Sequence, residues 1–276
     1  MKNVFLSLLG FCMASLYAPA QRLEKLWETD TLFKVPESVL YDISSGRVFV
    51  SNIDGASNGK DGKGHISLLT KDGKIKKSVW ASGINAPKGL GLYGKSLYVA
   101  DLDAIAIFQT GNGTLQKRIE IPGAKFLNDL TIYEKGTIYV SDSETGIIHK
   151  MEQGKKPEAI ITGRTRPNGV LWFQNKLWFL DAGTLYVFDQ GNITQIASGM
   201  ERSTDGIEPI DQQNFLVSAW IGTMYVVNQD GSVKEILNTK EQKVNCADIG
   251  FDQKNRIVFV PTFNGNRVVA YRLIMD

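Results

Sequence analysis

The sequence has few of the residues on which many catalytic and disulfide-stapled folds depend. Only two cysteines and two histidines occur in 276 residues, and the net charge is +2 with no long run of one sign. Because no basic stripe is interleaved with aromatic residues, nucleic acid is not expected as a partner. A Gly-rich phosphate loop leading into a helix is also missing, which argues against a nucleotide site. The mixed charges indicate a solvated surface.

Long hydrophobic runs are missing except at the N-terminus. Lys2, an apolar stretch over residues 4–17 and the small residues 18–20 predict a signal peptide over residues 1–20, cut before Gln21. The stretch is too short to cross a bilayer. We therefore expect export to the periplasm or the extracellular medium, without stable membrane insertion. Lipoprotein anchoring through Cys12 is the alternative, although bulky Phe11 stands where a small residue normally precedes a lipidated cysteine.

After cleavage Cys246 is the one cysteine left, so no internal disulfide is possible and packing must supply the stability. A nucleophilic cysteine would need a base, and the two histidines, His65 and His149, both fall in strand-like runs. We expect a buried structural cysteine. A Ser-His-Asp hydrolase is not supported, and neither histidine stands near a second plausible zinc ligand.

The mature chain shows no helical periodicity, but it repeats one plan six times. Each unit has a short turn, an apolar strand, a tight turn and a stronger strand that ends in acidic or small polar residues. The units begin at Pro36, Pro87, Leu127, Pro167, Thr204 and Cys246. Their starts lie 51, 40, 40, 37 and 42 residues apart. Two further strand-like stretches complete each unit, with β-branched and aromatic residues at alternating positions.

Four antiparallel strands per unit, repeated six times, predict an all-β fold, a six-bladed β-propeller that forms a single domain over residues 21–276. The sixth unit lacks one strand, and residues 22–30 supply an unpaired strand at the other end. Pairing the two would close the ring and remove two exposed sheet edges. The first unit is longer because residues 54–64 are inserted after its second strand, and their Gly and Lys content favours a flexible surface loop.

Equivalent residues of a propeller form a ring, because every innermost strand starts on the same face beside the central channel. The second residues of the six units are Glu37, Lys88, Asn128, Asn168, Asp205 and Ala247. Four of them carry side-chain oxygens, the ligands that a hard divalent cation prefers. Asn-Gly and Asp-Gly are also ordinary turn signals, but glutamate is a poor turn residue. We therefore predict that Glu37, Asn128, Asn168 and Asp205 bind one divalent cation, Ca²⁺ first, with Zn²⁺, Mn²⁺ or Mg²⁺ as alternatives.

These motifs, in their order and spacing, resemble the senescence marker protein (regucalcin) and gluconolactonase family, with paraoxonases as more distant relatives. The resemblance covers residues 22–276 and is carried by "PES" at Glu37, "LND" at Asn128-Asp129, "RPNG" at Asn168 and "TDG" at Asp205. It implies one catalytic metal at the top of the channel, held by the matching Glu, Asn, Asn and Asp. It also implies hydrolysis of lactones or related esters.

The chain departs from the family at three places. Phe126 stands where gluconolactonase-type members often carry an arginine that helps hold a sugar acid. Asp101 and Asp103 lie in the stretch where paraoxonases use a histidine, and Ser38 replaces an acid beside their buried structural calcium. The metal site therefore carries over, whereas the substrate and the second calcium do not.

The expected function is a secreted, metal-dependent lactonase or esterase, acting first on a sugar lactone, with the cation polarising the carbonyl. Asp205 would be both ligand and base, with Asp101, Asp103 and Asp129 as alternatives. The expected substrate-binding residues are Lys88, Phe126 and Trp220. Lys88 would pair with a substrate carboxylate or balance neighbouring acids, unless it points to solvent. Trp172, Trp178 and Trp220 are candidates to line a sugar pocket, but tryptophans at strand positions more often pack between blades. Trp220 is the one of the three that is retained as a substrate-binding residue.

Two other functions stay open. One is a non-catalytic propeller that binds partners and keeps a structural or vestigial metal. The other is a metal-dependent lyase or isomerase that uses the same cation. Because a propeller hosts many functions, the fold alone does not decide between them. In each enzymatic case we expect a monomer acting on a small-molecule substrate.

Overall fold

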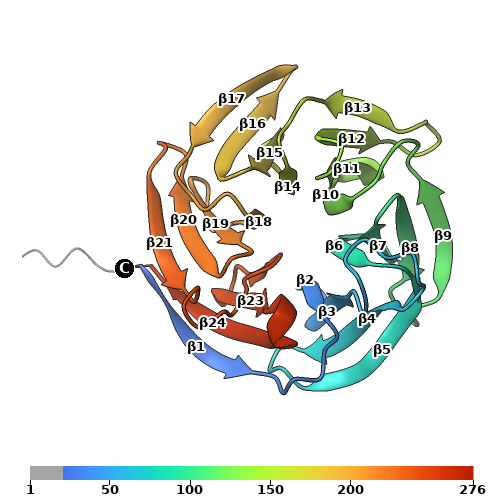
Figure 1. Ribbon diagram of the computed structural model, residues 1–276, viewed down its shortest axis with the longest axis horizontal. Coiled ribbons are helices and arrows are strands. Elements are labelled where there is room, and N and C mark those ends of the chain that lie inside the picture. Colours follow the sequence, from blue (N-terminus) through green and yellow to red (C-terminus); the bar gives the residue numbers. More distant parts are fainter. Residues whose placement is uncertain (1–20, 276) are drawn as a thin grey trace, which may run out of the picture.

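The computed structural model describes residues 21–275 as six four-stranded antiparallel sheets arranged in a ring (Figure 1). The predicted six-bladed propeller is confirmed. The predicted signal peptide, including Cys12, lies outside the described residues. Besides strands, this part of the chain has two short 3-10 turns, η1 (Glu134–Gly136) and η2 (Phe263–Gly265). None of its helices is long and apolar enough to cross a membrane.

Each blade runs from an inner strand beside the channel to an outer strand on the rim (Figure 1). The first blade consists of β2 (Pro36–Asp42), β3 (Arg47–Asn52), β4 (Gly64–Thr70) and β5 (Ile75–Ile84). The second consists of β6 (Pro87–Tyr93), β7 (Ser96–Asp101), β8 (Ala104–Gln109) and β9 (Leu115–Glu120). The third consists of β10 (Leu127–Tyr133), β11 (Thr137–Asp142), β12 (Ile147–Met151) and β13 (Glu158–Ile161).

The remaining blades follow the same order, except that the last one takes its outer strand from the N-terminus. The fourth consists of β14 (Pro167–Phe173), β15 (Lys176–Asp181), β16 (Thr184–Asp189) and β17 (Asn192–Ala197). The fifth consists of β18 (Thr204–Pro209), β19 (Asn214–Ala219), β20 (Thr223–Asn228) and β21 (Val233–Asn238). The sixth consists of β22 (Gly250–Asp252), β23 (Ile257–Pro261), β24 (Val268–Ile274) and β1 (Arg22–Glu28).

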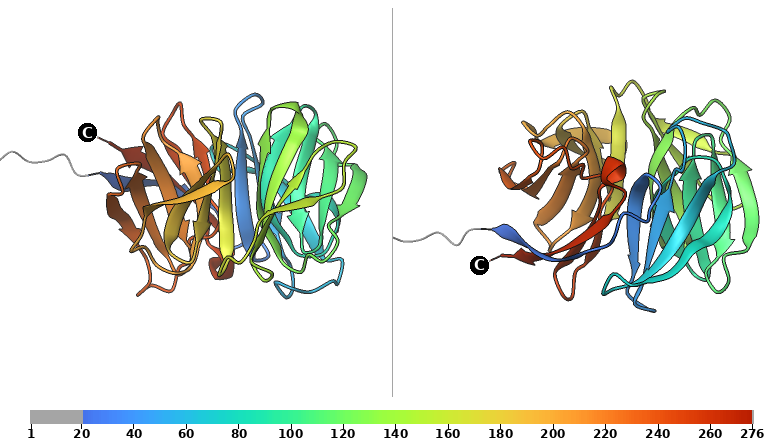
Figure 2. Two further views of the ribbon diagram at one scale, coloured as in Figure 1. Left: turned by 90° about the horizontal axis from the view of Figure 1, so that it is seen from above. Right: turned by 60° about the horizontal axis from the view of Figure 1, so that its bottom comes forward.

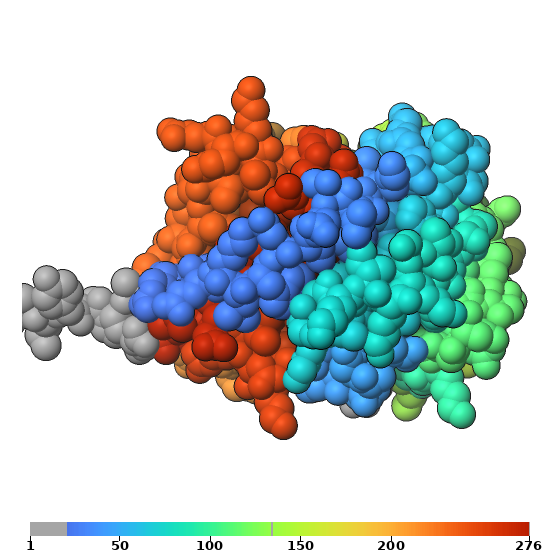
Figure 3. All heavy atoms as spheres, turned by 90° about the horizontal axis from the view of Figure 1, so that it is seen from below, coloured from blue at the N-terminus to red at the C-terminus, as the bar shows by residue number. Residues whose placement is uncertain are grey.

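The ring closes through β1, as the unpaired strand at residues 22–30 predicts. β1 pairs antiparallel with β24, from Arg22 opposite Ile274 to Glu28 opposite Val269. The two described ends of the chain therefore lie side by side (Figure 2). In the space-filling view the N-terminal segment runs along the outside of the ring, between the C-terminal blade and the first blade (Figure 3). The pairing covers what would be a free sheet edge.

Neighbouring blades are held together by apolar side chains on alternate strand positions. Trp178 of the fourth blade packs on Phe215 of the fifth, with ring centroids 4.6 Å apart. Trp172 stacks on Tyr139 of the third blade at 5.1 Å. Such pairs contribute about 0.5–1.5 kcal/mol beyond the area that they bury. Trp172 and Trp178 therefore pack between blades, as expected.

Candidate functional site

A β-bulge places the second residue of each of the first five units outside the strand ladder. In the first five blades, the register between the inner strand and its neighbour shifts between the first and the fourth residue, as between Pro36 and Val39 or Pro167 and Val170. Bulges of this kind re-aim side chains and are common beside active sites. The later residues of each inner strand alternate between the two faces of the sheet in the normal way. Because of the shift, the second residues of the units are exempt from this alternation and lie together in a ring.

Glycine allows adjacent inner strands to approach each other at this bulge. A Cβ on Gly169 would lie 2.2 Å from the backbone oxygen of Asp205 in the next blade. A Cβ on Gly206 would likewise lie 2.4 Å from Oδ1 of Asp248. No real Cβ tolerates such distances, so the Gly of "PNG" and "TDG" is needed for close backbone approach as well as for turning the chain.

The sixth unit differs from the other five. Its inner strand β22 begins at Gly250, four residues later than the repeat predicts. The residues before it form only one isolated bridge, between Asp248 and Ser38 of the first blade. Ala247 occupies the sixth slot and offers no side-chain oxygen. The ring of possible ligands is therefore open on this side.

A cavity of about 350 Å³ opens at the start of the inner strands. Its lining includes all four residues predicted to bind the cation: Glu37, Asn128, Asn168 and Asp205. The three residues predicted to bind substrate also line it: Lys88, Phe126 and Trp220. These seven predicted residues come from five blades, and Glu37 and Trp220 are 183 positions apart in the sequence. The fold brings all seven to one cavity.

The amide side chains of the cavity turn their nitrogens into the protein. Nδ2 of Asn168 donates to Oδ1 of Asp205 at 2.8 Å, and Nδ2 of Asn128 donates to Oγ of Ser143 at 3.0 Å. The Ser143 hydroxyl in turn donates to the backbone oxygen of Pro167, so toward Asn128 it can only accept. This network fixes the orientation of the Asn128 amide and leaves its oxygen for other contacts.

Two oxygens of the predicted ligand set are buried without a hydrogen-bond partner among residues 21–275: Oε2 of Glu37 and Oδ1 of Asn168. A buried acceptor left unpaired costs about 1–3 kcal/mol. A divalent cation would contact such oxygens, and four protein oxygens would leave coordination positions for water or substrate. The residues present therefore fit a hard divalent cation.

The two amides are essential to this ligand set. Within residues 21–275, no three His, Cys, Asp or Glu side chains come together as a metal site. Among residues 21–275, Glu37 and Asp205 contribute the only carboxylates that line the cavity. A cation held here would thus have two charged and two neutral protein ligands, the kind of oxygen set that suits Ca²⁺.

The surroundings of Glu37 and Asp205 disfavour the ionised form of both carboxyl groups. Burial raises the pKa of Glu37 well above its usual range, and the nearby charge of Asp205 raises it further. Burial raises the pKa of Asp205 to about 8, with Asp248 adding to the rise. Both shifts reflect negative charge confined in a low-dielectric channel. A bound dication would favour the ionised forms.

Lys88 is buried in the cavity wall, 1% exposed, and so does not point to solvent. Its ammonium donates to the backbone oxygens of Ser57 at 2.8 Å and Ala86 at 3.1 Å, and lies 4.4 Å from the centre of the Phe126 ring. Burial lowers the pKa of Lys88, against the opposing charge of Glu37. Lys88 is therefore a positive charge fixed beside the two carboxylates.

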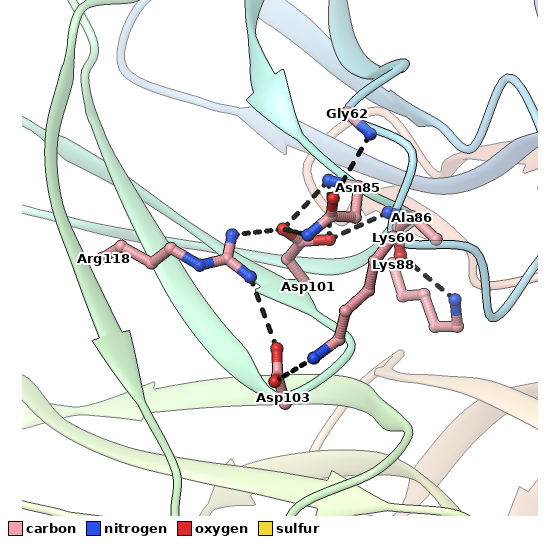
Figure 4. A network of polar contacts seen from close by, with 8 residues as sticks. All are labelled: Lys60, Gly62, Asn85, Ala86, Lys88, Asp101, Asp103 and Arg118. Atoms are coloured by element: carbon pink, nitrogen blue, oxygen red, sulfur yellow. Dashed lines mark hydrogen bonds and ion pairs between the residues drawn. The ribbon is translucent and has the colours of Figure 1, made fainter.

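Asp101 and Asp103 lie outside the cavity lining and are held by other partners (Figure 4). The Asp101 carboxylate accepts the backbone N–H groups of Asn85 and Ala86 and pairs with Arg118. The Asp103 carboxylate pairs with Lys60 at 2.5 Å and with Arg118 at 3.4 Å. These contacts tie blade 2 to the segment that precedes its own inner strand.

The arrangement around Asp101 recurs in other blades. Asp142 accepts the backbone N–H groups of Lys125 and Phe126, and Asp181 accepts those of Thr165 and Arg166. In each case the acid at the end of the second strand fixes the two residues just before the inner strand. The acidic residues at the ends of the second strands are thus explained by the backbone N–H groups that they accept, which would otherwise lack hydrogen-bond partners.

Asp129 lies deeper in the channel. Its carboxylate accepts the N–H groups of Leu130 and Val170, each at 2.7 Å. It lines a second cavity of about 220 Å³ together with Glu208 and Asp248. Of the four carboxylates considered as bases, Asp205 is the one that lines the cavity holding the predicted ligands.

The insert at residues 54–64 forms part of the site. Lys60 pairs with Asp103, and Gly62 donates its N–H to Oδ1 of Asn85, so the segment is anchored to blade 2 (Figure 4). Ser57 of the insert lines the cavity and accepts from Lys88. The sequence predicts a flexible surface loop here, and that prediction missed the contribution of the insert to the cavity. The Gly and Lys content of the segment does not reveal its contacts with blade 2 and with Lys88.

Further lining residues were not predicted from the sequence: Ile53, Ser57, Arg166, Ser203, Thr204 and Phe263. Arg166 directly precedes "PNG", and Thr204 is the first residue of "TDG", so these two motifs are the sequence signal that points to both residues. Phe263 packs edge-on against Trp220, with ring centroids 5.5 Å apart. It belongs to a short 3-10 turn that has no counterpart in the other units.

Three residues with reactive or metal-binding side chains lie away from the cavity. His65 and His149 belong to β4 and β12 and do not line it. Cys246 is free and 1% exposed. Burial raises the pKa of its thiol to about 12. The expectation of a buried structural cysteine is confirmed.

The chain is similar in fold to known proteins, although its sequence matches none closely. No protein-family model matches the chain, and no curated protein matches it. Among solved structures, the chain is similar to a gluconolactonase from Xanthomonas campestris, with 14% identity, a TM-score of 0.69, and coverage of 93% of this chain and 95% of that one. It is also similar to a virginiamycin B lyase from Staphylococcus aureus, with 15% identity, a TM-score of 0.65, and coverage of 92% and 100%. That lyase was solved in a catalytically inactive form in which one histidine is replaced by alanine. At these identities the likeness shows the fold alone: the chain is a six-bladed β-propeller of the architecture shared by a gluconolactonase and a streptogramin lyase.

Proposed function

We propose that this protein is a metal-dependent hydrolase that opens a lactone or a related ester. The observation that carries the proposal is the pair of buried, unpartnered oxygens, Oε2 of Glu37 and Oδ1 of Asn168, beside Asp205 in one open cavity. The cation would be held by Glu37, Asn128, Asn168 and Asp205, with Ca²⁺ as the first candidate. The N-terminal sequence pattern supports activity outside the cytoplasm.

When bound, a divalent cation supplies a Lewis acid for the substrate carbonyl. The ionised Asp205 accepts a proton from the attacking water, whose oxygen forms a bond to the carbonyl carbon. The ring C–O bond then breaks, and the proton passes to the departing oxygen. The products are a carboxylate and an alcohol on one chain, a hydroxy acid, with a proton released by ionisation of the new acid.

A lyase is the second candidate because a lyase has the same architecture. That enzyme is inactive when one histidine is replaced by alanine. In this chain the only two histidines, His65 and His149, lie outside the cavity lining. The absence of an imidazole from the cavity favours hydrolysis over a histidine-dependent elimination.

The test is a panel of lactones and esters, offered to metal-stripped protein with and without Ca²⁺, Zn²⁺ or Mn²⁺. We expect hydrolysis only with a cation, and its loss in Asp205→Ala. Asp189→Asn, which removes a carboxylate of a surface ion pair with Lys176, is the matched control. Metal-independent hydrolysis that survives Asp205→Ala would contradict the mechanism. No turnover together with tight cation binding would favour a binding module.

A further inference from the structure

One cationic side chain of the cavity, that of Arg166, acts on Asp205 through its charge but has no direct partner among residues 21–275. Arg166 lies on the exposed rim, two residues before Asn168. Its backbone N–H donates to Oδ1 of Asp181 at 2.7 Å, which fixes the main chain. Among residues 21–275 its guanidinium has no hydrogen bond and no ion pair. By contrast, Arg164 pairs with Asp181 at 2.8 Å and lies 4.3 Å from the Tyr186 ring.

The other cation of the cavity is already committed. Two ammonium hydrogens of Lys88 are directed to the backbone oxygens of Ser57 and Ala86, and its charge lies over the face of Phe126. Lys88 therefore offers less to an incoming ligand than its charge suggests. Arg166 keeps all its side-chain donors, in the planar fork that matches a carboxylate.

The charge balance of the cavity also favours an anion. Glu37 and Asp205 are opposed by Lys88 and Arg166, so the lining is close to neutral without a cation. A bound dication would leave an excess of positive charge. Opposite charge is then expected on the ligand, because a cleft lined by one sign of charge concentrates the other.

The rim offers space for a group that extends away from the predicted cation. A neighbouring cavity of about 270 Å³ shares Ser57, Phe126 and Arg166 with the first. Its one carboxylate, Glu144, is exposed and pairs with Lys125 at 3.5 Å. A substrate whose carbonyl lies near Asp205 can therefore place its far end beside Arg166 without meeting an unpaired acid.

We propose that Arg166 is a specificity residue that binds a carboxylate of the substrate, and that the substrate class is lactones bearing a second, free carboxylate, such as lactones of sugar dicarboxylic acids. This inference rests on the proposed hydrolase function. One charge-assisted, two-pronged contact is expected to give a preference of about tenfold to a hundredfold over a neutral analogue.

The experiment compares two substrates that differ only at C6: glucaro-1,4-lactone, which carries a carboxylate, and neutral glucono-1,4-lactone. We expect the calcium-loaded protein to show the higher kcat/KM on the carboxylate-bearing lactone. In Arg166→Gln the ratio of the two kcat/KM values should fall by about tenfold or more. Arg202→Gln is the control, because Arg202 is exposed and precedes Asp205 by three residues but does not line the cavity.

A preference for the neutral lactone, or an equal loss on both substrates in Arg166→Gln, would overturn the inference. Calorimetry keeps the two proposals separable. Glucarate should bind the calcium-loaded protein more tightly than gluconate, which lacks only the C6 carboxylate, and Arg166→Gln should remove that difference. If no lactone is hydrolysed, the hydrolase proposal fails, and equal binding of glucarate and gluconate would then overturn the carboxylate site as well.

Discussion

The side-chain amide of Asn168 donates a 2.8 Å hydrogen bond to Oδ1 of Asp205, across the boundary between the fourth and fifth blades. The bond orients both groups at once. It leaves Oδ1 of Asn168 buried without a partner in the described part of the chain, and it uses only one oxygen of Asp205. Two adjacent blades thus present oxygens to the same cavity, held in place by each other.

Calcium should stabilise the folded protein, because binding to the native state alone shifts the unfolding equilibrium. At a free concentration about 100 times Kd, the gain is about 2.7 kcal/mol. For a domain of this size, that raises Tm by about 5–10 °C. Differential scanning fluorimetry of metal-stripped protein, with and without Ca²⁺, measures the shift.

The calcium-dependent rise should disappear in Glu37→Gln and Asn168→Ala, which remove one charged and one neutral oxygen ligand. Glu201→Gln, which affects only an exposed ion pair with Lys240, should keep it. A rise of the same size in all three variants would show that Ca²⁺ binds elsewhere.

Asp205 and Asp101 should have separable roles, although both acids follow from the repeat. Asp205→Asn should lower metal-supported hydrolysis at least about a hundredfold, because the base and one charged ligand are lost. Asp101→Asn should instead weaken the fold, since it breaks the buried contact to Arg118 and to two backbone N–H groups. We expect a loss of about 2–3 kcal/mol in the free energy of unfolding, below the full cost of a wholly buried pair because Arg118 is partly exposed.

Urea denaturation and hydrolysis rates, measured on the same preparations, check this separation. Hydrolysis by Asp101→Asn below its transition temperature should persist. A variant that stays as stable as wild type but loses turnover would assign Asp101 to the chemistry.

Glu208, in the deeper cavity, should make the metal-free protein less stable as pH rises. Burial raises the pKa of Glu208 from its usual 4.5 to about 8, with Asp248 adding to the rise. A carboxyl with a raised folded-state pKa contributes stability that is complete below the unfolded value and is lost as pH rises through the folded value. Glu208→Gln should therefore flatten the fall in Tm between about pH 5 and about pH 9.

Thermal unfolding in chelator across that pH range is the measurement. Glu201→Gln should keep the wild-type slope, because its carboxylate is near the surface. A Glu208→Gln slope equal to that of wild type would mean that Glu208 is ionised in the fold at ordinary pH.

Cys246 should be chemically inert in the native protein. Burial raises the pKa of the thiol to about 12, so almost no thiolate is present near neutrality. A thiol reagent should react only after denaturation, and Cys246→Ala should retain hydrolysis. Rapid labelling of the folded protein together with loss of turnover would identify a nucleophile instead.

The fold could be predicted from the sequence because its signal is repeated. Six copies of one pattern outweigh the ambiguity of any single strand, and the missing strand at one end matched the spare strand at the other. The same repetition brought Glu37, Asn128, Asn168 and Asp205 into register. The sixth unit deviates where its pattern is weakest, and β22 begins four residues after the predicted start.

Residues whose contacts are not repeated from blade to blade could not be placed in the site by the repeat. The burial of Lys88 depends on a backbone oxygen from the insert, which no periodicity reports. Phe263 reaches the cavity from a turn unique to the sixth blade. Asp101 resembles a catalytic acid in sequence, but its partners are N–H groups of its own blade. Such tertiary hydrogen bonds decide the role of a carboxylate.

The central claim is that oxygens from four blades hold one cation at the mouth of the channel. A crystal structure of the calcium-loaded protein, with the ion located by its anomalous scattering, tests this most directly. We predict one ion bonded to Glu37, Asn128, Asn168 and Asp205 at about 2.3–2.6 Å, the range for Ca²⁺ and oxygen. A calcium-loaded crystal in which the ion lies elsewhere, or in which these four side chains bind none, would contradict the account.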